Sequence, residues 1–211
     1  MINIGFGQFE QTKERIGSAY NDIQVGFFEA AKATALNAWN YNPTYSLWRK
    51  GEELSAYNQD NTYLNKDDLN KEYASLGLNF KEDTRKHVVD YLVKRKEEEI
   101  DRQHTISKGP QNYFAKGGYF LTSLGTSFLD PINIAASFVP IVGQAKFAGM
   151  VAKSGKNIAR MKKGFIEGFA GNLAVEPVVY GVHRSQQSDY SSYDAFVNVA
   201  AGGLILSLIH I

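Results

Sequence analysis

The sequence of 211 residues contains no cysteine and only five prolines, and its net charge is close to zero, at +1. Without cysteine the chain cannot form a disulfide framework, a thiolate metal site or a thiol nucleophile. A net charge this small gives no overall field that would favour a polyanion, so nucleic acid is only weakly suggested as a partner. The first residues, MINIGFGQFEQTKER, lack the basic and then apolar pattern of a secretory signal.

Motifs for catalysis and cofactor binding are also missing. No G-x-S-x-G elbow occurs, and GMVAKSGKN departs from a phosphate loop in its glycine spacing and in the residue after its lysine. Glu167 and Glu176 are more typical of structural acids near helix ends than of a catalytic carboxylate pair. The four histidines, none of which belongs to a two-histidine metal motif, are His87, His104, His183 and His210. We therefore expect no enzymatic activity, cofactor, metal ion or small-molecule substrate for this segment.

The charges are distributed unevenly along the chain. Residues 1–110 carry 17 acids and 15 bases, whereas residues 111–211 carry 5 acids and 8 bases with most of the glycine-rich apolar sequence. The composition changes near Gly109-Pro110, which is the best candidate for a boundary. We predict an all-α chain with a charged helical region over 1–110 and an apolar, glycine-punctuated array of helical hairpins over 111–211.

Two helices are predicted in the N-terminal region. The first carries an apolar face from Tyr20 and Ile23 through Phe27 to Ala38, and it should end at Asn42-Pro43, because proline disfavours helical geometry in the residue before it. The second spans about 82–104. Its charged run KRKEEEIDR is typical of a solvated face.

An aromatic cluster follows the first helix. Its members are Trp39, Tyr41, Tyr45 and Trp48. Packing of rings at a helix junction is the favoured interpretation, since such rings are amphipathic; stacking on bases or contact with a lipid interface are the alternatives.

The segment from Gly117 to Ala145 contains 29 residues, of which only Asp130 is charged. Asp130-Pro131 should end one helix and start another, because aspartate caps helices well and proline is favoured at the first helical position. Neither helix reaches the roughly 20 apolar residues of a simple membrane span. The pair is predicted to form an apolar helical hairpin, buried in protein or inserted as a re-entrant unit.

A basic amphipathic helix is predicted over 147–165. Apolar residues from Phe147 to Phe165 share one face, and the bases occupy another. Such a helix is suited to anionic lipid or nucleic-acid phosphate, although an ordinary surface helix has the same pattern. The candidate contact residues are Lys153, Lys156, Arg160 and Lys163.

Small residues follow at helical spacing. Gly164 and Gly168 form a G-x-x-x-G step with Gly171 three residues later, a pattern that lets two helices approach closely in membranes and in soluble proteins. After the polar stretch 183–194 the chain closes with residues 195–211, which carry no formal charge. A chain end this apolar is typical of a truncated protein.

The order of these elements resembles the internal virion proteins of tailed bacteriophages. The similar region covers roughly residues 118–205 and consists of Asp130-Pro131, Pro140 to Gly143, Lys146 to Lys163, Gly164 to Gly171, Val175 to Tyr180, Gln187 to Tyr190 and Ala200 to Leu204. The resemblance implies a protein that is ejected through the phage tail and helps DNA cross the host envelope. It also implies a place in the virion interior and then in the host envelope, with other virion proteins, copies of itself or an anionic membrane as partners.

Two other functions are compatible with the sequence. One is a soluble helical interaction module within a larger phage or plasmid polyprotein. The other is the N-terminal part of a cell-wall hydrolase whose catalytic domain lies elsewhere.

Overall fold

The structure, a computed structural model, describes residues 24–58, 61–137 and 140–210. Within these ranges the chain is all-α, apart from a short antiparallel pair of strands, which confirms the predicted fold class. The N-terminal half contains α2 (Phe27–Tyr41), α3 (Pro43–Ala56), β1 (Tyr63–Leu64), α4 (Lys66–Glu72), a 3-10 turn (Ala74–Leu76), β2 (Thr84–Arg85) and α5 (Lys86–Lys108). The C-terminal half contains α6 (Tyr113–Phe128), α7 (Pro131–Ser137), α8 (Gln144–Ser154), α9 (Lys156–Ser185) and α10 (Ser192–Ile209).

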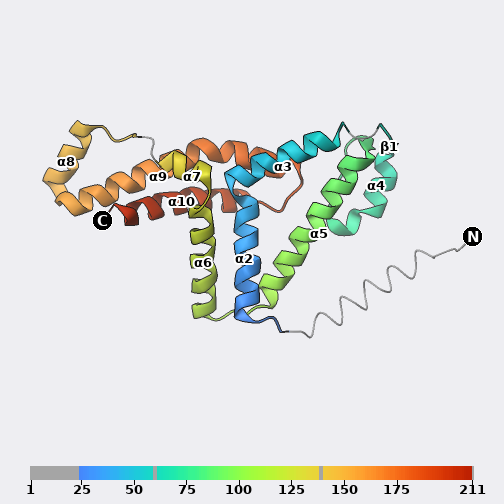
Figure 1. Cartoon of the computed structure of the whole chain (residues 1–211), viewed down its shortest axis with the longest axis horizontal. Helices are drawn as coiled ribbons and strands as arrows, with labels where there is room; N and C mark the ends of the chain where they lie inside the picture. Colours follow the sequence, from blue (N-terminus) through green and yellow to red (C-terminus); the bar gives the residue numbers. More distant parts are fainter. Residues whose placement is uncertain (1–23, 59–60, 138–139, 211) are drawn as a thin grey trace, which may run out of the picture.

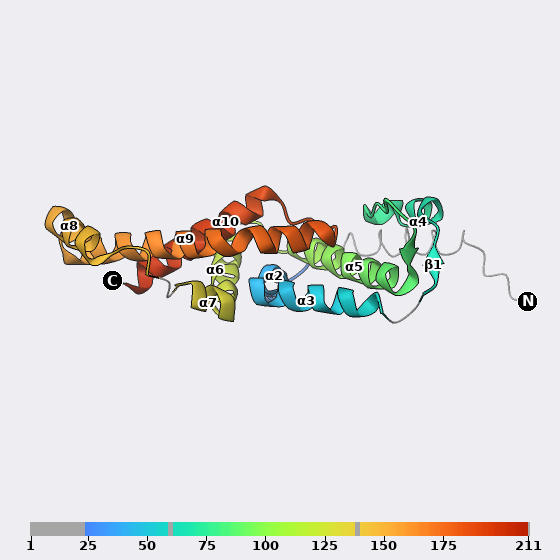
Figure 2. The ribbon, with the colours of Figure 1, turned by 90° about the horizontal axis from the view of Figure 1, so that it is seen from above.

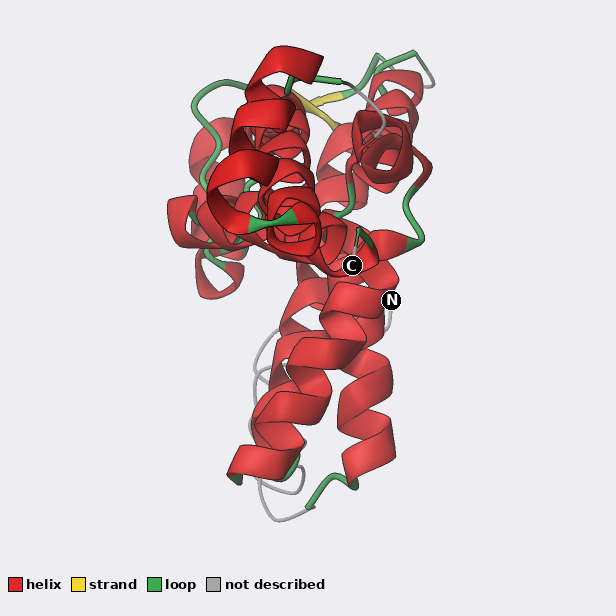
Figure 3. Cartoon of the chain, turned by 90° about the vertical axis from the view of Figure 1, so that its left-hand side faces the viewer, coloured by secondary structure: helices red, strands yellow, loops and turns green. Residues whose placement is uncertain are grey.

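The helices are arranged around one long pair. α9 and α10 lie side by side, and α3 runs beside the C-terminal part of α9 (Figure 2). α2, α5 and α6 extend away from this pair, with α2 packed against both of the others (Figure 1). Viewed from the end, these extending helices form a narrow stem below the wider layer (Figure 3).

Two separate clusters of buried apolar side chains involve α2 to α6. The larger lies where α5 meets α4 and the end of α3, and its buried members are Ala56, Leu69, Leu78, Phe80, Val88, Val89 and Leu92. The smaller joins α2 to α6 through Ala30, Ala115 and Tyr119. The α9–α10 pair lies outside both clusters and buries mainly small residues; Ala159, Gly164, Gly168, Val199, Ala201 and Gly203 are examples.

The break between α2 and α3 lies where the sequence predicts it. Asn42 has extended backbone angles, φ −66° and ψ 143°, and Pro43 occupies the first position of α3. Tyr20 and Ile23, which were expected on the apolar face of this helix, lie outside the described residues.

Asp130 caps α7 as predicted and also joins it to α3. Its Oδ1 accepts hydrogen bonds from the backbone N–H groups of Ile132 (2.9 Å) and Asn133 (3.0 Å), and its Oδ2 accepts one from Thr44 N–H (3.0 Å). The side chain is completely buried. Because all three partners are backbone donors, the carboxylate fixes the position of one helix start against another.

The predicted hairpin of two apolar helices is not formed as expected. α6 packs mainly against α2, and α7 packs mainly against α9. The reason is that each helix finds a complementary surface elsewhere: Tyr119 of α6 stacks on Phe27 of α2, and Ala136 of α7 contacts Gly171 of α9. Phe138, which belongs to the predicted apolar segment 117–145, lies outside the described residues.

The prediction of one basic helix over 147–165 is wrong. Gly155 has φ +78°, which ends α8 and starts α9 in a new direction. Glycine adopts this conformation without the steric cost that a side chain would bring. α9 continues through Pro177 and ends at Ser185, within the polar stretch 183–194. Pro177 cannot donate to the carbonyl of Leu173, and both residues are exposed, so this carbonyl is open to solvent.

The glycines of α9 bring its backbone close to its neighbours. A methyl group on Gly164 would lie 2.5 Å from the carbonyl oxygen of Leu206 on α10, and one on Gly168 would overlap the carbonyl of Gly202. On the next face, a methyl group on Gly171 would lie 2.5 Å from the carbonyl of Ala136 on α7. These glycines therefore act by their lack of a side chain.

Gly168→Ala is expected to destabilise the fold by about 2 kcal/mol or more, because the new methyl group meets backbone that cannot turn aside. Gly181→Ala, in the same helix, is the matched control. Its new methyl group meets nothing within 4 Å, so the higher helix propensity of alanine should stabilise the fold by up to about 1 kcal/mol. Denaturant unfolding followed by circular dichroism measures both; equal effects of the two substitutions would contradict the close packing of α9 on α10.

Candidate functional site

The four predicted contact residues are brought to one end of the molecule but not to one helix face. Lys153 lies on α8, and Lys156, Arg160 and Lys163 lie on α9 beyond the turn at Gly155. The first three are exposed. The expected continuous basic face is thus replaced by two short basic surfaces around a turn.

Lys163 has a structural partner. It forms an ion pair with Glu167, which is 3% exposed and also accepts hydrogen bonds from the backbone N–H groups of Ile141 and Val142, both at 3.1 Å. Burial opposes ionisation of Glu167, but Lys163 and these two N–H groups lower its pKa overall. Lys163 therefore helps to hold the segment before α8 and is a poor candidate for contact with a partner.

Exposed apolar side chains lie at the same end. The C-terminal turns of α10 expose Leu208 and Ile209, at 65% and 57%, and α9 exposes Ile158 at 50%. Figures 1 and 2 place these turns beside α8 and the start of α9. We call this surface the basic end; it consists of Lys146, Lys153, Lys156, Ile158, Arg160, Lys162, Leu208 and Ile209.

α10 has one further property that bears on this surface. Of the helices in the described ranges, α10 is the one that is long and apolar enough to cross a membrane, although buried helices of soluble proteins also meet that criterion. Ser191 and Asp194 form a capping box at its start.

A buried polar centre joins α3 to α9. His183 is completely buried, with Nε2 3.0 Å from Ser46 Oγ and Nδ1 3.3 Å from a guanidinium nitrogen of Arg49. Its ring stacks on Tyr190 at 4.7 Å and meets the edge of Tyr41 at 5.0 Å. Burial, reinforced by the nearby arginines, lowers the pKa of His183 to about 3, so the imidazole is neutral.

Tyr190 connects this centre to Glu176, an acid that is partly buried. Its hydroxyl donates to Glu176 Oε1 at 2.6 Å and accepts from Asn198 Nδ2 at 2.6 Å. Burial raises the pKa of Glu176 to about 7, and the hydrogen bond from Tyr190 opposes the rise. Glu176 and Glu167 lie on the same helix about 13.5 Å apart along its axis, too far for the paired carboxylates of a glycosidase.

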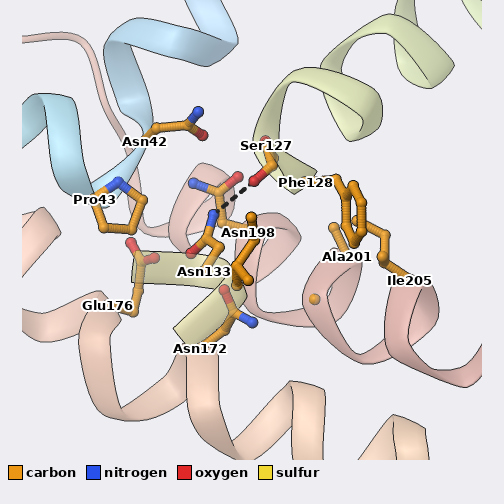
Figure 4. A pocket seen from close by; sticks show the side chains of 12 residues that line it. Asn42, Pro43, Ser127, Phe128, Asn133, Asn172, Glu176, Asn198, Ala201 and Ile205 are labelled. Carbon is orange, nitrogen blue, oxygen red and sulfur yellow. Dashed lines mark hydrogen bonds between the residues drawn. The ribbon is translucent and has the colours of Figure 1, made fainter. Parts of the chain in front are cut away.

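A small polar pocket lies beside Glu176. Asparagine side chains from several elements line it: Asn42 between α2 and α3, Asn133 on α7, Asn172 on α9 and Asn198 on α10 (Figure 4). The free space of about 30 Å³ holds one or two water molecules. Within the described ranges no three histidine or acidic side chains gather in a way that could hold a metal ion. The size and polar lining of the pocket are therefore suited to ordered water.

The aromatic cluster is divided between two environments. Trp39, Tyr45 and Trp48 form a chain of contacts, with ring centroids 6.3 and 5.2 Å apart, while Tyr41 turns inward to His183. Trp48 remains 56% exposed. This matches the expected packing of rings at a helix junction.

The charged run on α5 is not wholly solvated, which corrects the expectation for KRKEEEIDR. Lys96 and Glu99 are 6% and 4% exposed and form an ion pair at 3.1 Å. Glu99 Oε1 also accepts from Tyr41 (2.9 Å), Ser188 (2.6 Å) and the backbone N–H of Asp189 (3.1 Å). No local pattern predicts this burial, because the partners of Glu99 lie about 60 to 90 residues away in the chain.

No protein-family model, curated protein or solved structure matches this chain.

Acidification should destabilise the fold through His183. The pKa of His183 in the folded state is below the ordinary value of 6.5. The neutral imidazole therefore makes its full contribution to the free energy of unfolding above pH 6.5, and below that pH the contribution falls by about 1.4 kcal/mol per pH unit. Urea unfolding of the wild type and of His183→Gln at about pH 7.5 and about pH 5 tests this. The variant should be less stable at the higher pH but lose less on acidification, whereas His104→Gln should follow the wild type; parallel pH profiles for all three would contradict the assignment.

Glu176 should have the opposite pH dependence. Its folded pKa is raised, so its contribution is complete below about pH 4.5 and is lost as the pH rises towards 7. Glu176→Gln keeps an acceptor for Tyr190 and should therefore gain about 1 kcal/mol relative to the wild type between pH 5 and pH 8, after allowance for partial exposure. Glu82→Gln, an exposed acid, is the control; a difference from wild type that is constant with pH would refute the prediction.

Proposed function

We propose that this chain is a non-enzymatic segment of an internal virion protein of a tailed bacteriophage, which helps deliver DNA across the host envelope through helix–helix and membrane contacts. The observation that carries the proposal is the basic end, where exposed cations and exposed apolar side chains from α8, α9 and α10 share one surface. On this proposal the protein lies in the virion interior and later in the host envelope. Its partners are other virion proteins, further copies of itself and an anionic membrane.

The composition of the basic end suits anionic lipid. Each lysine or arginine near such a surface contributes about 1 kcal/mol, and apolar side chains add about 25 cal/mol per Å² that they remove from water. The five bases of this surface have no ion pair with a described residue. Their charge is therefore available to the lipid headgroups.

The overall construction of the chain supports passage through a phage tail. A cysteine-free chain made of helices depends mostly on local contacts, which re-form quickly after a passage in a largely unfolded state. The apolar helices α6 and α10 would then reassemble against lipid or against other copies.

Vesicle flotation tests the proposal. The wild-type chain should float with vesicles that contain phosphatidylglycerol, more at low than at high salt, and should stay in solution with pure phosphatidylcholine. Replacing Lys153, Lys156 and Arg160 together by glutamine should weaken binding on the order of 100-fold, since about 3 kcal/mol of attraction is removed. Lys163 is left intact because its ion pair with Glu167 is structural.

The matched control replaces three exposed lysines at the opposite end, Lys71, Lys81 and Lys94, by glutamine. This control carries the same change in net charge, so it should bind vesicles nearly as well as the wild type. Equal loss in both triple variants would mean that overall charge acts and not the basic end. A wild-type chain that ignores anionic vesicles at low salt would favour a soluble interaction module or part of a cell-wall hydrolase.

A further inference from the structure

A second pocket, independent of the basic end, lies where α3, α5 and the segment after α9 meet. Four of the side chains that line it are cationic and one is acidic. The cations are Arg49, Arg95, Lys96 and Arg102, and the acid is Glu99. A small pocket with this balance of charge has an excess of positive charge within a few ångströms.

The carboxylates near this pocket pair with other groups, so two of its arginines have no carboxylate partner. Glu99 forms an ion pair with Lys96 and accepts hydrogen bonds from three neutral donors. Lys96 also forms an ion pair with Asp189 at 2.5 Å. Arg95 pairs with Glu98 at 3.1 Å. No ion pair to Arg49 or Arg102 occurs among the described residues.

Arg49 is the most deeply placed of the cations. It is 4% exposed, its guanidinium lies 3.3 and 3.4 Å from the two ring nitrogens of His183, and its Nε has no hydrogen-bond partner in the described part of the chain. The Nε atoms of Arg95 and Arg102 are unpartnered there as well. A neutral imidazole accepts at most one hydrogen bond, so His183 satisfies only one of the five N–H donors of Arg49.

Aromatic contacts offset only part of the free-energy cost of burying these charges. The guanidinium groups of Arg49 and Arg95 lie 5.6 and 5.9 Å from the centre of the Tyr45 ring. Such contacts contribute about 0.5 to 2 kcal/mol, whereas a buried charge without a counter-ion costs several kcal/mol. Burial and then repulsion by Arg95 lower the pKa of Arg49 to about 10, and the same two causes lower the pKa of Arg102.

We propose that this pocket binds one phosphate-type oxyanion, held by Arg49, Arg95 and Arg102. Guanidinium groups present paired N–H donors that match the oxygens of phosphate, which makes arginine the preferred residue for this recognition. Arg102 is partly exposed and forms no hydrogen bond to a described residue, so its side chain can turn toward the ion. The enclosed space is about 10 Å³, enough for one water molecule, so a phosphate group must lie at the mouth of the pocket, where Arg102 turns to admit it. The group is either a free ion or the tip of a larger molecule.

Thermal unfolding in the presence of inorganic phosphate tests the site, with sodium chloride used to keep the ionic strength constant. Phosphate stabilises most proteins weakly by exclusion from their surface, without saturation. Binding at a site should instead give a saturable rise in Tm, of roughly 5–10 °C at 100-fold excess over Kd. Broadening of the phosphorus NMR signal of phosphate by the protein provides a second measurement that does not depend on unfolding.

Arg102→Gln should remove the saturable part of the Tm rise and the NMR broadening. Without phosphate it should be at least as stable as the wild type, because one repelling charge is gone. Arg184→Gln, an exposed arginine of α9 outside the pocket, should retain both responses of the wild type. A wild type without saturable stabilisation and without line broadening would overturn the proposal, as would identical responses of the wild type and Arg102→Gln.

Phenyl phosphate distinguishes the two sources of the ligand. Saturable stabilisation by both phosphate and phenyl phosphate, lost in each case in Arg102→Gln, would identify a site for a phosphate group carried on a larger molecule. Stabilisation by inorganic phosphate alone would identify a site for the free ion.

Discussion

The close approach of α9 and α10 is the contact on which the rest of the arrangement depends. It requires bare backbone at Gly164 and Gly168 on one helix and at Gly202 on the other. Once these helices are paired, α3 and α7 pack on α9, and the apolar end of α10 is carried to the turn between α8 and α9. A single methyl group in this contact thus acts on the fold and on the basic end together.

Buried polar groups fix the positions in which the other helices pack around this pair. His183 ties α9 to α3, Glu99 ties α5 to the segment after α9, and Asp130 ties α7 to α3. Such groups add little net stability, but each one penalises any arrangement that leaves it unpaired. His183 and Glu176 also have opposite effects on the pH dependence of stability. On acidification between about pH 6.5 and 4.5, the stability lost at His183 is offset by the stability gained at Glu176.

Local signals in the sequence were sufficient for the helix ends that proline and aspartate define. Asn42-Pro43 and Asp130-Pro131 were placed correctly because each acts on its own backbone. The turn at Gly155 was missed because a glycine inside an apolar-periodic stretch is compatible with a helix, and only the positive φ reveals the turn. The buried centre was not predictable either, since Ser46 and His183 are 137 residues apart and neither belongs to a motif.

Large apolar side chains are exposed on both α6 and α10. Tyr113 and Phe114 are each 94% exposed, and Leu121 and Phe196 are 68% and 62% exposed. Single apolar residues at a surface need no explanation, but adjacent large apolar side chains that are almost fully exposed, such as Tyr113 and Phe114, favour contact with protein or lipid. At the basic end such side chains are accompanied by cations, which favours lipid, whereas Tyr113 and Phe114 at the start of α6 have Lys116 as the nearest cation in sequence. On the proposed function, this difference in composition assigns the start of α6 to other protein chains and the basic end to the membrane.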